Sequence, residues 1–212
     1  MKLNLGCGSR TPDGWVNVDF ALGAKFARIP LFRIANRRLR LFDLDWDERI
    51  RLHDLTKPFP WDDASIGVVY SSHMLEHLSR EDGRRFLRQC HRVLRVGGII
   101  RLVVPDLRHV VNEYVEGRVL ADDFVRTLGV LHEGSGGRLK RRLSPFVASP
   151  HTHKCMYDCS RLIEVLHEIG FQASAREAFE SDIDDIDSVE LKSRTNHAAI
   201  VEGRKIASSD CA

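Results

Sequence analysis

The stretch Leu3-Asn4-Leu5-Gly6-Cys7-Gly8 decides the fold, because a short apolar run ends directly in a Gly-x-Gly turn. Lys2 to Leu5 are predicted to form the first strand of a sheet. The glycines that follow let backbone N–H groups approach a ligand without a Cβ in the way. In open α/β sheets, ligands bind at the carboxyl ends of the strands, which is where these glycines lie. The stretch therefore predicts a strand that ends in a ligand site, with a plain tight turn as the alternative.

Beyond this turn, short β-rich runs alternate with helical patterns, which indicates one α/β domain with a doubly wound sheet. Glu81–Val96 is a predicted helix that Gly97-Gly98 stops. Cys159–Ile169 is a second predicted helix, capped by Asp158 and closed by Gly170. The predicted strands are residues 2–5, 15–20, 51–55, 66–70, 99–104, 171–179 and 197–203.

The composition is that of an ordinary soluble globular protein, since 43% of the 212 residues are hydrophobic and 29% are charged. The net charge of +2 is too balanced to indicate a nucleic-acid-binding protein. The apolar runs are far shorter than the roughly 18 residues of a membrane span, and the N-terminus has no apolar signal core. The five cysteines suit reduced thiols. We therefore expect a cytoplasmic monomer or homodimer without a membrane span.

Two carboxylates stand where predicted strands end. Asp19 closes the second strand and is suited to accept hydrogen bonds from a ribose diol, and Asp54 closes the third, where an adenine amino group could donate to it. Each alone is more often a solvated carboxylate, but together they suggest a nucleoside beside the glycine turn. The dinucleotide fingerprint would require a further glycine three positions after Gly8, where this chain has Thr11.

Six motifs, taken in order and spacing, resemble class I S-adenosylmethionine-dependent methyltransferases. The resemblance is closest to a type 11-like, small bacterial branch with a Gly-Trp-x-Asn-Val-Asp signature. It covers roughly residues 1–107 and returns at 151–171 and 197–205. The motifs are Leu3 to Gly8, Gly14-Trp15-Val16-Asn17-Val18-Asp19, His53-Asp54-Leu55, Pro58 to Asp63, Leu75-Glu76-His77-Leu78 and Val93 to Gly98.

The resemblance implies a Rossmann-like fold, with a seven-stranded mixed, mostly parallel sheet and helices on both faces. Residues 1–207 would form a single domain with an acceptor-side insertion at about 108–155, and residues 208–212 would be a tail. The loop from Gly8 to Trp15 is too short for a full crossover helix, which normally takes about a dozen residues. We therefore expect a reduced first helix.

The resemblance also implies that S-adenosylmethionine is the cofactor and S-adenosylhomocysteine the product. The glycine turn would cradle the methionine and ribose, Asp19 would hold the ribose hydroxyls, and Asp54 with Leu55 would bind the adenine edge. Serines after the fourth strand would line the methionine end. The implied cofactor-binding set is Asn4, Gly6, Cys7, Gly8, Asp19, Asp54, Leu55, Ser71, Ser72 and His77.

Candidates for a catalytic base follow the fourth and fifth strands. Methyl transfer from an activated sulfonium is mostly in-line positioning, and a base is needed only for a poorly acidic acceptor. His73 is the first candidate, and Asp106 and His109 rank after it. The alternative for each is a polar residue that satisfies loop backbone.

The acceptor side is expected to include His151 and His153 as pocket walls, and Arg138, in the basic run 138–142, as a ligand for a phosphate group. The acidic loop 182–190 would rim the far side of the site or be solvated. The predicted function is methylation of a small-molecule or carbohydrate-type acceptor at oxygen. The alternatives are methylation of RNA or protein, and a non-catalytic S-adenosylmethionine-binding protein.

Two histidine clusters have donors that suit metals. His73-Met74-Leu75-Glu76-His77 spells H-x-x-E-H, an inverted zinc-peptidase motif in which both histidines would share one helix face. His151-x-His153-x-Cys155-x-x-x-Cys159 has zinc-type ligands within nine residues. The flanks fit the methyltransferase pattern better, so no metal is predicted. A zinc hydrolase and a magnesium ion assisting an acceptor hydroxyl remain open.

Overall fold

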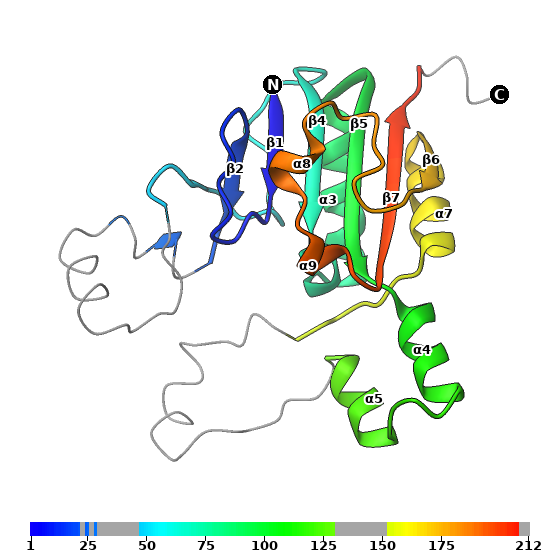
Figure 1. Ribbon diagram of the computed structural model, residues 1–212. Helices are drawn as coiled ribbons and strands as arrows, with labels where there is room; N and C mark the ends of the chain where they lie inside the picture. The colour runs from blue at the N-terminus through cyan, green and yellow to red at the C-terminus, as the bar shows by residue number, and fades with distance from the viewer. Residues whose placement is uncertain (22–23, 26–27, 29–46, 130–151, 208–212) are drawn as a thin grey trace.

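The computed structural model describes residues 1–21, 24–25, 28, 47–129 and 152–207 (Figure 1). Its centre is a seven-stranded sheet in the order β3-β2-β1-β4-β5-β7-β6. The first five strands are parallel, and β7 runs antiparallel to both β5 and β6. This confirms the predicted mixed, mostly parallel sheet. The strands are β1 (Lys2–Leu5), β2 (Val16–Asp19), β3 (Arg51–Leu52), β4 (Ile66–Ser72), β5 (Leu94–Pro105), β6 (Phe171–Ala175) and β7 (Ala198–Lys205).

The helices differ greatly in length. They are η1 (Leu75–His77, a 3-10 turn), α3 (Arg80–Val93), α4 (Leu107–Val115), α5 (Ala121–Thr127), α7 (Cys159–Ile169), α8 (Ile186–Val189) and α9 (Lys192–Thr195). The predicted ends of α7 are confirmed, since Asp158 accepts a hydrogen bond from the backbone N–H of Arg161 and Gly170 adopts φ 107°. None of the described helices is long and apolar enough to cross a membrane.

The prediction that Gly97-Gly98 stops a helix is wrong. The helix α3 ends at Val93, and Leu94 already pairs with Ile66 in the sheet. The register then shifts, so that Val68 pairs with Ile99 and the glycines lie in a bulge of β5. A Cβ on Gly98 would lie 2.8 Å from the carbonyl oxygen of Arg95, which explains the glycine at that position.

One face of the sheet, here called the helical face, is covered by α3 and α7 (Figure 1). Every second residue of the central strands points to it, including Leu3, Ile100 and Val201, each 0% exposed. From the helices, Phe86 and Leu166 enter the same core. The stripes of apolar residues predicted for both helices therefore form this contact.

The opposite face is covered by residues 176–195, here called the cover segment, which contains the short helices α8 and α9 (Figure 1). Ile183, Ile186 and Val189 pack from it onto a second apolar cluster that includes Tyr70 and Val103 of the sheet. Helices thus lie on both faces, as predicted, but on this face they are single turns.

A buried arginine ties the cover segment to the sheet. Arg101, in the middle of β5, is 0% exposed. It donates to Glu190 through Nε and Nη2, at 2.9 Å each, and to Glu202 of β7 at 3.2 Å. Its remaining N–H groups bond the carbonyl oxygens of Glu177 and Glu180, at 3.0 and 2.8 Å. All five guanidinium donors are therefore used, as a buried charge requires.

Residues 6–15 form turns and no helix, so the expected reduced first helix is wrong. Two neighbouring side-chain amides hold the loop instead. Asn4 Nδ2 donates to Asn17 Oδ1 at 2.9 Å and to the Arg10 carbonyl at 3.2 Å. Asn17 Nδ2 donates to the carbonyls of Pro12 and Trp15, at 3.2 Å each. These bonds satisfy backbone groups that a helix would otherwise pair.

Candidate functional site

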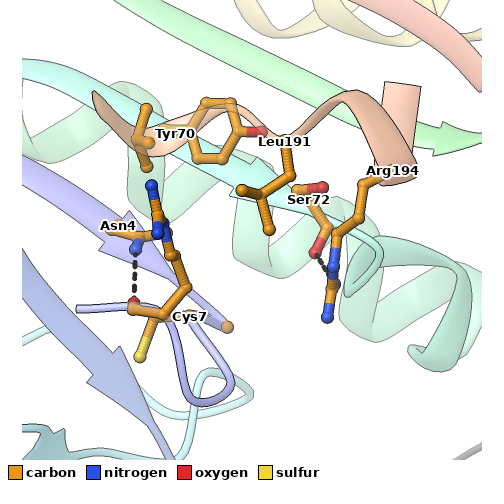
Figure 2. A pocket seen from close by; sticks show the side chains of 9 residues that line it. Asn4, Cys7, Tyr70, Ser72, Leu191 and Arg194 are labelled. Carbon is orange, nitrogen blue, oxygen red and sulfur yellow. Dashed lines mark hydrogen bonds between the residues drawn. The ribbon is translucent and has the colours of Figure 1, made fainter. Parts of the chain in front are cut away.

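A pocket lies where the carboxyl ends of β1 and β4 meet the cover segment (Figure 2). It is open to solvent, and the space between its walls, open solvent included, is about 270 Å³. Its lining combines the glycine turn and β4 with residues nearly 190 positions further along the chain. The lining residues are Asn4, Gly6, Cys7, Arg10, Tyr70, Ser72, Val189, Leu191 and Arg194. Four of the ten residues predicted to bind cofactor are thus in this lining, namely Asn4, Gly6, Cys7 and Ser72.

The glycine turn is bonded to the second strand. The backbone N–H groups of Gly6 and Cys7 both donate to the carbonyl of Val18, at 2.9 and 3.1 Å. Gly8 N–H donates to Asp19 Oδ2 at 2.8 Å. These three donors are therefore used within the protein, and the turn does not present them as an anion cradle. Gly6 adopts φ 73°, and a Cβ there would lie 2.5 Å from Cγ of Met74.

Asp19 organises this edge of the sheet. Its Oδ1 accepts from the backbone N–H groups of Phe20 and Ala21, at 2.7 Å each, while Oδ2 holds Gly8. The carboxylate thus lies beside the turn, as predicted, and it keeps lone pairs for a further donor such as a hydroxyl.

The pocket walls are uncharged at Cys7 and Tyr70. Burial, with the nearby charge of Asp19, raises the pKa of Cys7 to about 12. Burial also raises the pKa of Tyr70 to about 12. Ser72 Oγ is buried and has no hydrogen-bond partner among the described residues. At these three positions the pocket presents neutral polar groups, one of which lacks a hydrogen-bond partner, beside the charged side chains of Arg10 and Arg194.

The other predicted cofactor residues lie outside this lining. Asp54 Oδ1 accepts from the N–H and hydroxyl of Thr56, at 3.0 and 2.7 Å, and these bonds help to lower its pKa against the effect of burial. Leu55 is 8% exposed and packs in the core of the helical face. Ser71 donates to the Leu5 carbonyl at 2.9 Å and so joins two strand ends.

His73 follows β4 and stands beside the pocket. Its ring Nε2 lies 2.8 Å from the carbonyl of Arg194, a lining residue, and its Nδ1 lies 3.5 Å from Glu76 Oε1. Burial lowers the pKa of His73, so the neutral ring is favoured. The backbone at His73 has φ 52°, and the residue precedes η1. The expectation that His73 and His77 share one helix face is therefore wrong.

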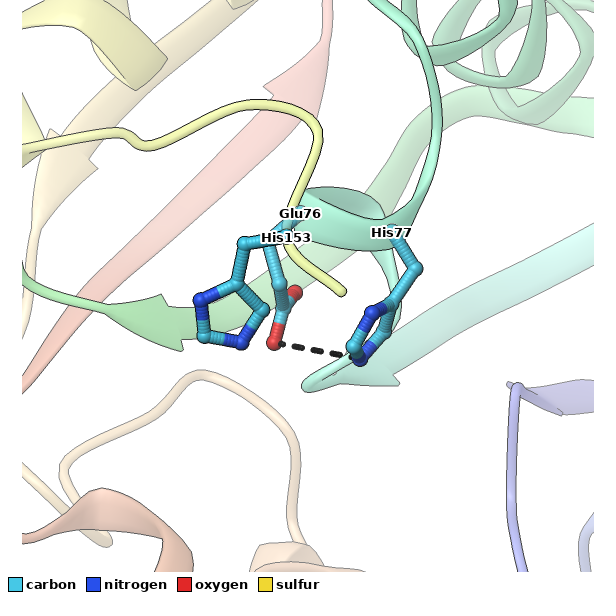
Figure 3. Close-up of side chains that lie close together, drawn as sticks. All are labelled: Glu76, His77 and His153. Atoms are coloured by element: carbon cyan, nitrogen blue, oxygen red, sulfur yellow. Dashed lines mark ion pairs between the residues drawn. The ribbon is translucent and has the colours of Figure 1, made fainter. Parts of the chain in front are cut away.

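Glu76 is buried at 1% exposure on η1, between His77 and His153 (Figure 3). His77 Nε2 lies 4.0 Å from Glu76 Oε1. The ring centroids of His77 and His153 are 5.3 Å apart. Burial raises the pKa of Glu76 to about 7. His77, predicted to lie with the cofactor, and His153, predicted to wall the acceptor pocket, thus meet around one carboxylate.

The other two candidate bases have different surroundings. Asp106 caps α4 by accepting from the backbone N–H of Arg108 at 3.0 Å. His109 stacks on His197, with ring centroids 4.1 Å apart. Of the three candidates, His73 is the one that contacts a residue of the pocket lining.

Two acceptor-side predictions, His151 and Arg138, lie outside the described residues. The cysteines of the second histidine cluster do not converge on His153 among the residues that the structure describes. Cys159 Sγ lies 3.9 Å from the carbonyl of Ile200 instead. Both Cys155 and Cys159 are free thiols.

Sequence reasoning missed part of the lining. Tyr70 is the last residue of the predicted strand 66–70, and its place at a strand end could have marked it as a lining residue. Arg10, Leu191 and Arg194 carried no local signal, because their places depend on long-range packing. The loop 182–190 does rim the site, as one alternative held, but through apolar Val189 and not through its acids.

Comparison with known proteins agrees with this geometry. Residues 3–102 match the Methyltransf_11 family model, described as a methyltransferase domain. By sequence, this stretch of just under half of the chain is similar to that methyltransferase domain. It contains most of β1, all of β2 to β4, the glycine turn, Glu76 and His77, whereas His153 lies outside it. The cofactor of the domain is S-adenosylmethionine. No match was found among the curated proteins.

Several solved structures share the fold of nearly the whole chain, beyond the stretch that the family model matches. One is a Haloferax volcanii methyltransferase in complex with the Trm112 methyltransferase activator, at 15% identity and a TM-score of 0.51, covering 97% of this chain and 82% of that one. Another is a SAM-dependent methyltransferase from Archaeoglobus fulgidus, at 16% identity and a TM-score of 0.50, covering 96% and 85%. Such low identity establishes a shared fold alone.

Proposed function

We propose that the protein transfers a methyl group from S-adenosylmethionine to a hydroxyl group of a small-molecule or carbohydrate-type acceptor. The family match and the fold support a methyltransferase. The observation that carries the finer proposal is His73, whose ring bonds the carbonyl of Arg194 at the pocket wall. A neutral imidazole next to a methyl-donor pocket suits an acceptor that must lose a proton, as a hydroxyl does.

The residues present fit the cofactor. Ser72 Oγ, buried without a partner, offers a hydrogen bond to a polar group in the pocket. Asp19 has lone pairs left for a ribose hydroxyl. Arg194 is held with Nη1 3.4 Å from the Ser72 carbonyl, so it fixes the wall opposite the glycine turn. When bound, the cofactor supplies a methyl group on a positively charged sulfur.

His73 is the proposed proton acceptor. A carbonyl oxygen only accepts hydrogen bonds, so the Nε2 that faces Arg194 carries the ring proton and Nδ1 carries a lone pair. In the transfer, an acceptor oxygen forms a bond to the methyl carbon and its hydroxyl proton passes to His73 Nδ1. The cofactor would supply the methyl group through its carbon–sulfur bond, whose electron pair would remain on sulfur.

The cofactor site is tested by calorimetric titration of S-adenosylhomocysteine into protein checked for co-purified cofactor. Wild type is expected to bind with a Kd of roughly micromolar order. Asp19→Asn should weaken binding by about tenfold or more, because a charged acceptor near a hydroxyl is replaced by an amide. The matched control is Asp62→Asn, an exposed carboxylate outside the lining. No binding by folded, ligand-free wild type would contradict the proposal.

Turnover is tested by formation of S-adenosylhomocysteine in mixtures of hydroxylated small molecules and sugars. His73→Asn should lower the rate by about 100-fold or more and change cofactor affinity far less, because it removes the proton acceptor together with one hydrogen bond to the pocket wall. Product found only with RNA or protein would favour those acceptors. Binding without product in any mixture would favour a non-catalytic role.

A further inference from the structure

Glu76, His77 and His153 bring three ligand atoms together beside the proposed acceptor site. One ligand atom from each lies within 4.8 Å of the others, and no second group of this kind occurs among residues 1–21, 47–129 and 152–207. Figure 3 shows the two rings on either side of the Glu76 carboxylate. Glu76 and His77 come from η1, and His153 comes from the chain that leads into α7, so the cluster joins two segments.

The hydrogen bonds of the two rings aim lone pairs at the carboxylate. His77 Nδ1 lies 3.3 Å from the Thr152 carbonyl, and His153 Nδ1 lies 2.9 Å from the Leu128 carbonyl. Because a carbonyl only accepts, each Nδ1 carries the proton and each Nε2 carries a lone pair. Metal-binding histidines are oriented in this way: one ring nitrogen donates to a carbonyl, and the other binds the ion.

The carboxylate itself receives no hydrogen bond from the described residues. Glu76 is 1% exposed, and neither of its oxygens accepts a hydrogen bond in the described part of the chain. A buried carboxylate without hydrogen bonds is costly. The adjacent group at His77 Nε2 is an acceptor as well, so the two cannot bond each other unless a proton or a cation lies between them. The cluster therefore has the donor pattern of a cation site.

We propose that Glu76, His77 and His153 bind one divalent transition-metal ion, with Zn²⁺ as the preferred ion. Two imidazoles and one carboxylate suit Zn²⁺ and its neighbours, whereas Mg²⁺ prefers oxygen ligands alone. Three protein ligands leave a coordination position open, as in catalytic zinc sites. The backbone of His153 is also held in place, because its N–H donates to the Gly129 carbonyl at 3.0 Å.

The role of the ion rests on the proposed function. His73 Nδ1 lies 3.5 Å from Glu76 Oε1, so an acceptor hydroxyl held at the open position would also be near the proposed proton acceptor. A divalent cation makes such a hydroxyl more acidic. Its proton then passes to His73, its oxygen forms the bond to the methyl carbon, and the carbon–sulfur pair stays on sulfur.

The test is calorimetric titration of Zn²⁺, and separately Mg²⁺, into chelator-treated full-length protein. Wild type should bind one Zn²⁺ per chain and prefer it to Mg²⁺. Glu76→Gln keeps the shape of the side chain, and His153→Asn changes a residue on the other segment. Each should weaken Zn²⁺ binding by about 100-fold or more, given that even outer partners of ligands are worth 10–100-fold. Co²⁺ should give visible absorption bands in wild type that both variants lose.

Two controls separate this site from other donors. His167→Asn changes an exposed histidine of α7 and should leave Zn²⁺ binding unchanged. Cys155→Ser with Cys159→Ser removes the thiols of the sequence cluster and should also leave it unchanged. The proposal is overturned if folded wild type binds no Zn²⁺, if Glu76→Gln and His153→Asn bind it as wild type does, or if the double serine variant alone loses it.

Titration of S-adenosylhomocysteine into the same samples keeps the two proposals apart. Cofactor binding without Zn²⁺ binding contradicts the metal site alone. Zn²⁺ binding without cofactor binding contradicts the proposed function and leaves the metal site supported.

Discussion

On the helical face, α3 and α7 bury apolar side chains against the sheet, whereas the cover segment on the opposite face is arranged around the charged side chain of Arg101. Apolar packing is non-directional, so it stabilises a helix without fixing its position to a fraction of an ångström. A guanidinium with five used donors fixes position as well as contact. The cover segment carries the pocket residues Leu191 and Arg194. The hydrogen bonds of Arg101 thus fix the cover segment, and this is the segment whose position determines one wall of the pocket.

The largest effect is expected from Arg101→Met. The change leaves the carboxylates of Glu190 and Glu202 buried without their cation, which costs about 3–5 kcal/mol. Because the cover segment loses its anchor, S-adenosylhomocysteine affinity should fall in protein that remains folded. Urea unfolding and calorimetric titration at low temperature measure the two effects.

Leu166→Ala is the matched change on the helical face. Leu166 is 0% exposed, and its truncation should cost about 2–5 kcal/mol through a cavity. Cofactor affinity should stay within about twofold of wild type, since α7 does not line the pocket. Equal losses of affinity in both variants would show that the two faces do not differ in this way.

A smaller effect is expected where the two faces meet. Gly6 lines the pocket, and Met74, against which its Cβ would clash, packs on the core of the helical face. Gly6→Ala should cost about 1–3 kcal/mol in stability and weaken S-adenosylhomocysteine binding. Gly14→Ala is the control, because Gly14 has φ 79° but nothing within 4 Å of the new Cβ. If both variants bind cofactor equally, the Met74 contact does not shape the pocket.

The smallest effect concerns a polar group on the helical face. The ring of His91 packs edge-on against Phe171, at 5.0 Å and 90°. Burial, followed by the charge of Lys205, lowers the pKa of His91 from its usual 6.5. The neutral ring is therefore favoured in the folded state, so its contribution to stability is complete above pH 6.5 and is lost progressively as the pH falls from 6.5 to the lowered pKa of the folded state.

His91→Gln should accordingly flatten the loss of stability as the pH falls below 6.5. Urea midpoints at several pH values measure this slope, with the exposed His167→Gln as control. An unchanged slope in His91→Gln would assign the acid sensitivity to other groups.

Features determined by neighbouring residues could be predicted from the sequence. The cap at Asp158 and the stop at Gly170 depend on bonds within one turn, and both are confirmed. Alternating apolar residues likewise located the central strands. Gly97-Gly98 misled because glycines end helices and form bulges alike, and the strand pairing of Leu94 with Ile66 decides between the two.

Features determined across the fold could not be predicted in the same way. Arg101 lies inside an apolar strand, and its partners Glu190 and Glu202 are 89 and 101 residues away. For the site, the H-x-x-E-H spacing marked Glu76 and His77 as metal-type donors. It could not show that His153 would join them, because that contact depends on how residues 152–154 pass over η1.

The pocket also has a consequence for the order of folding. Its walls come from the two ends of the described chain, and Lys2 forms an ion pair with Asp185, 183 residues later. Contacts of such long sequence separation form late, since the intervening chain must be ordered first. During synthesis, the glycine turn therefore emerges long before the residues that enclose it. The proposed cofactor pocket is therefore complete only after Val189, Leu191 and Arg194 have packed against it, and a ligand bound there would favour that completed state.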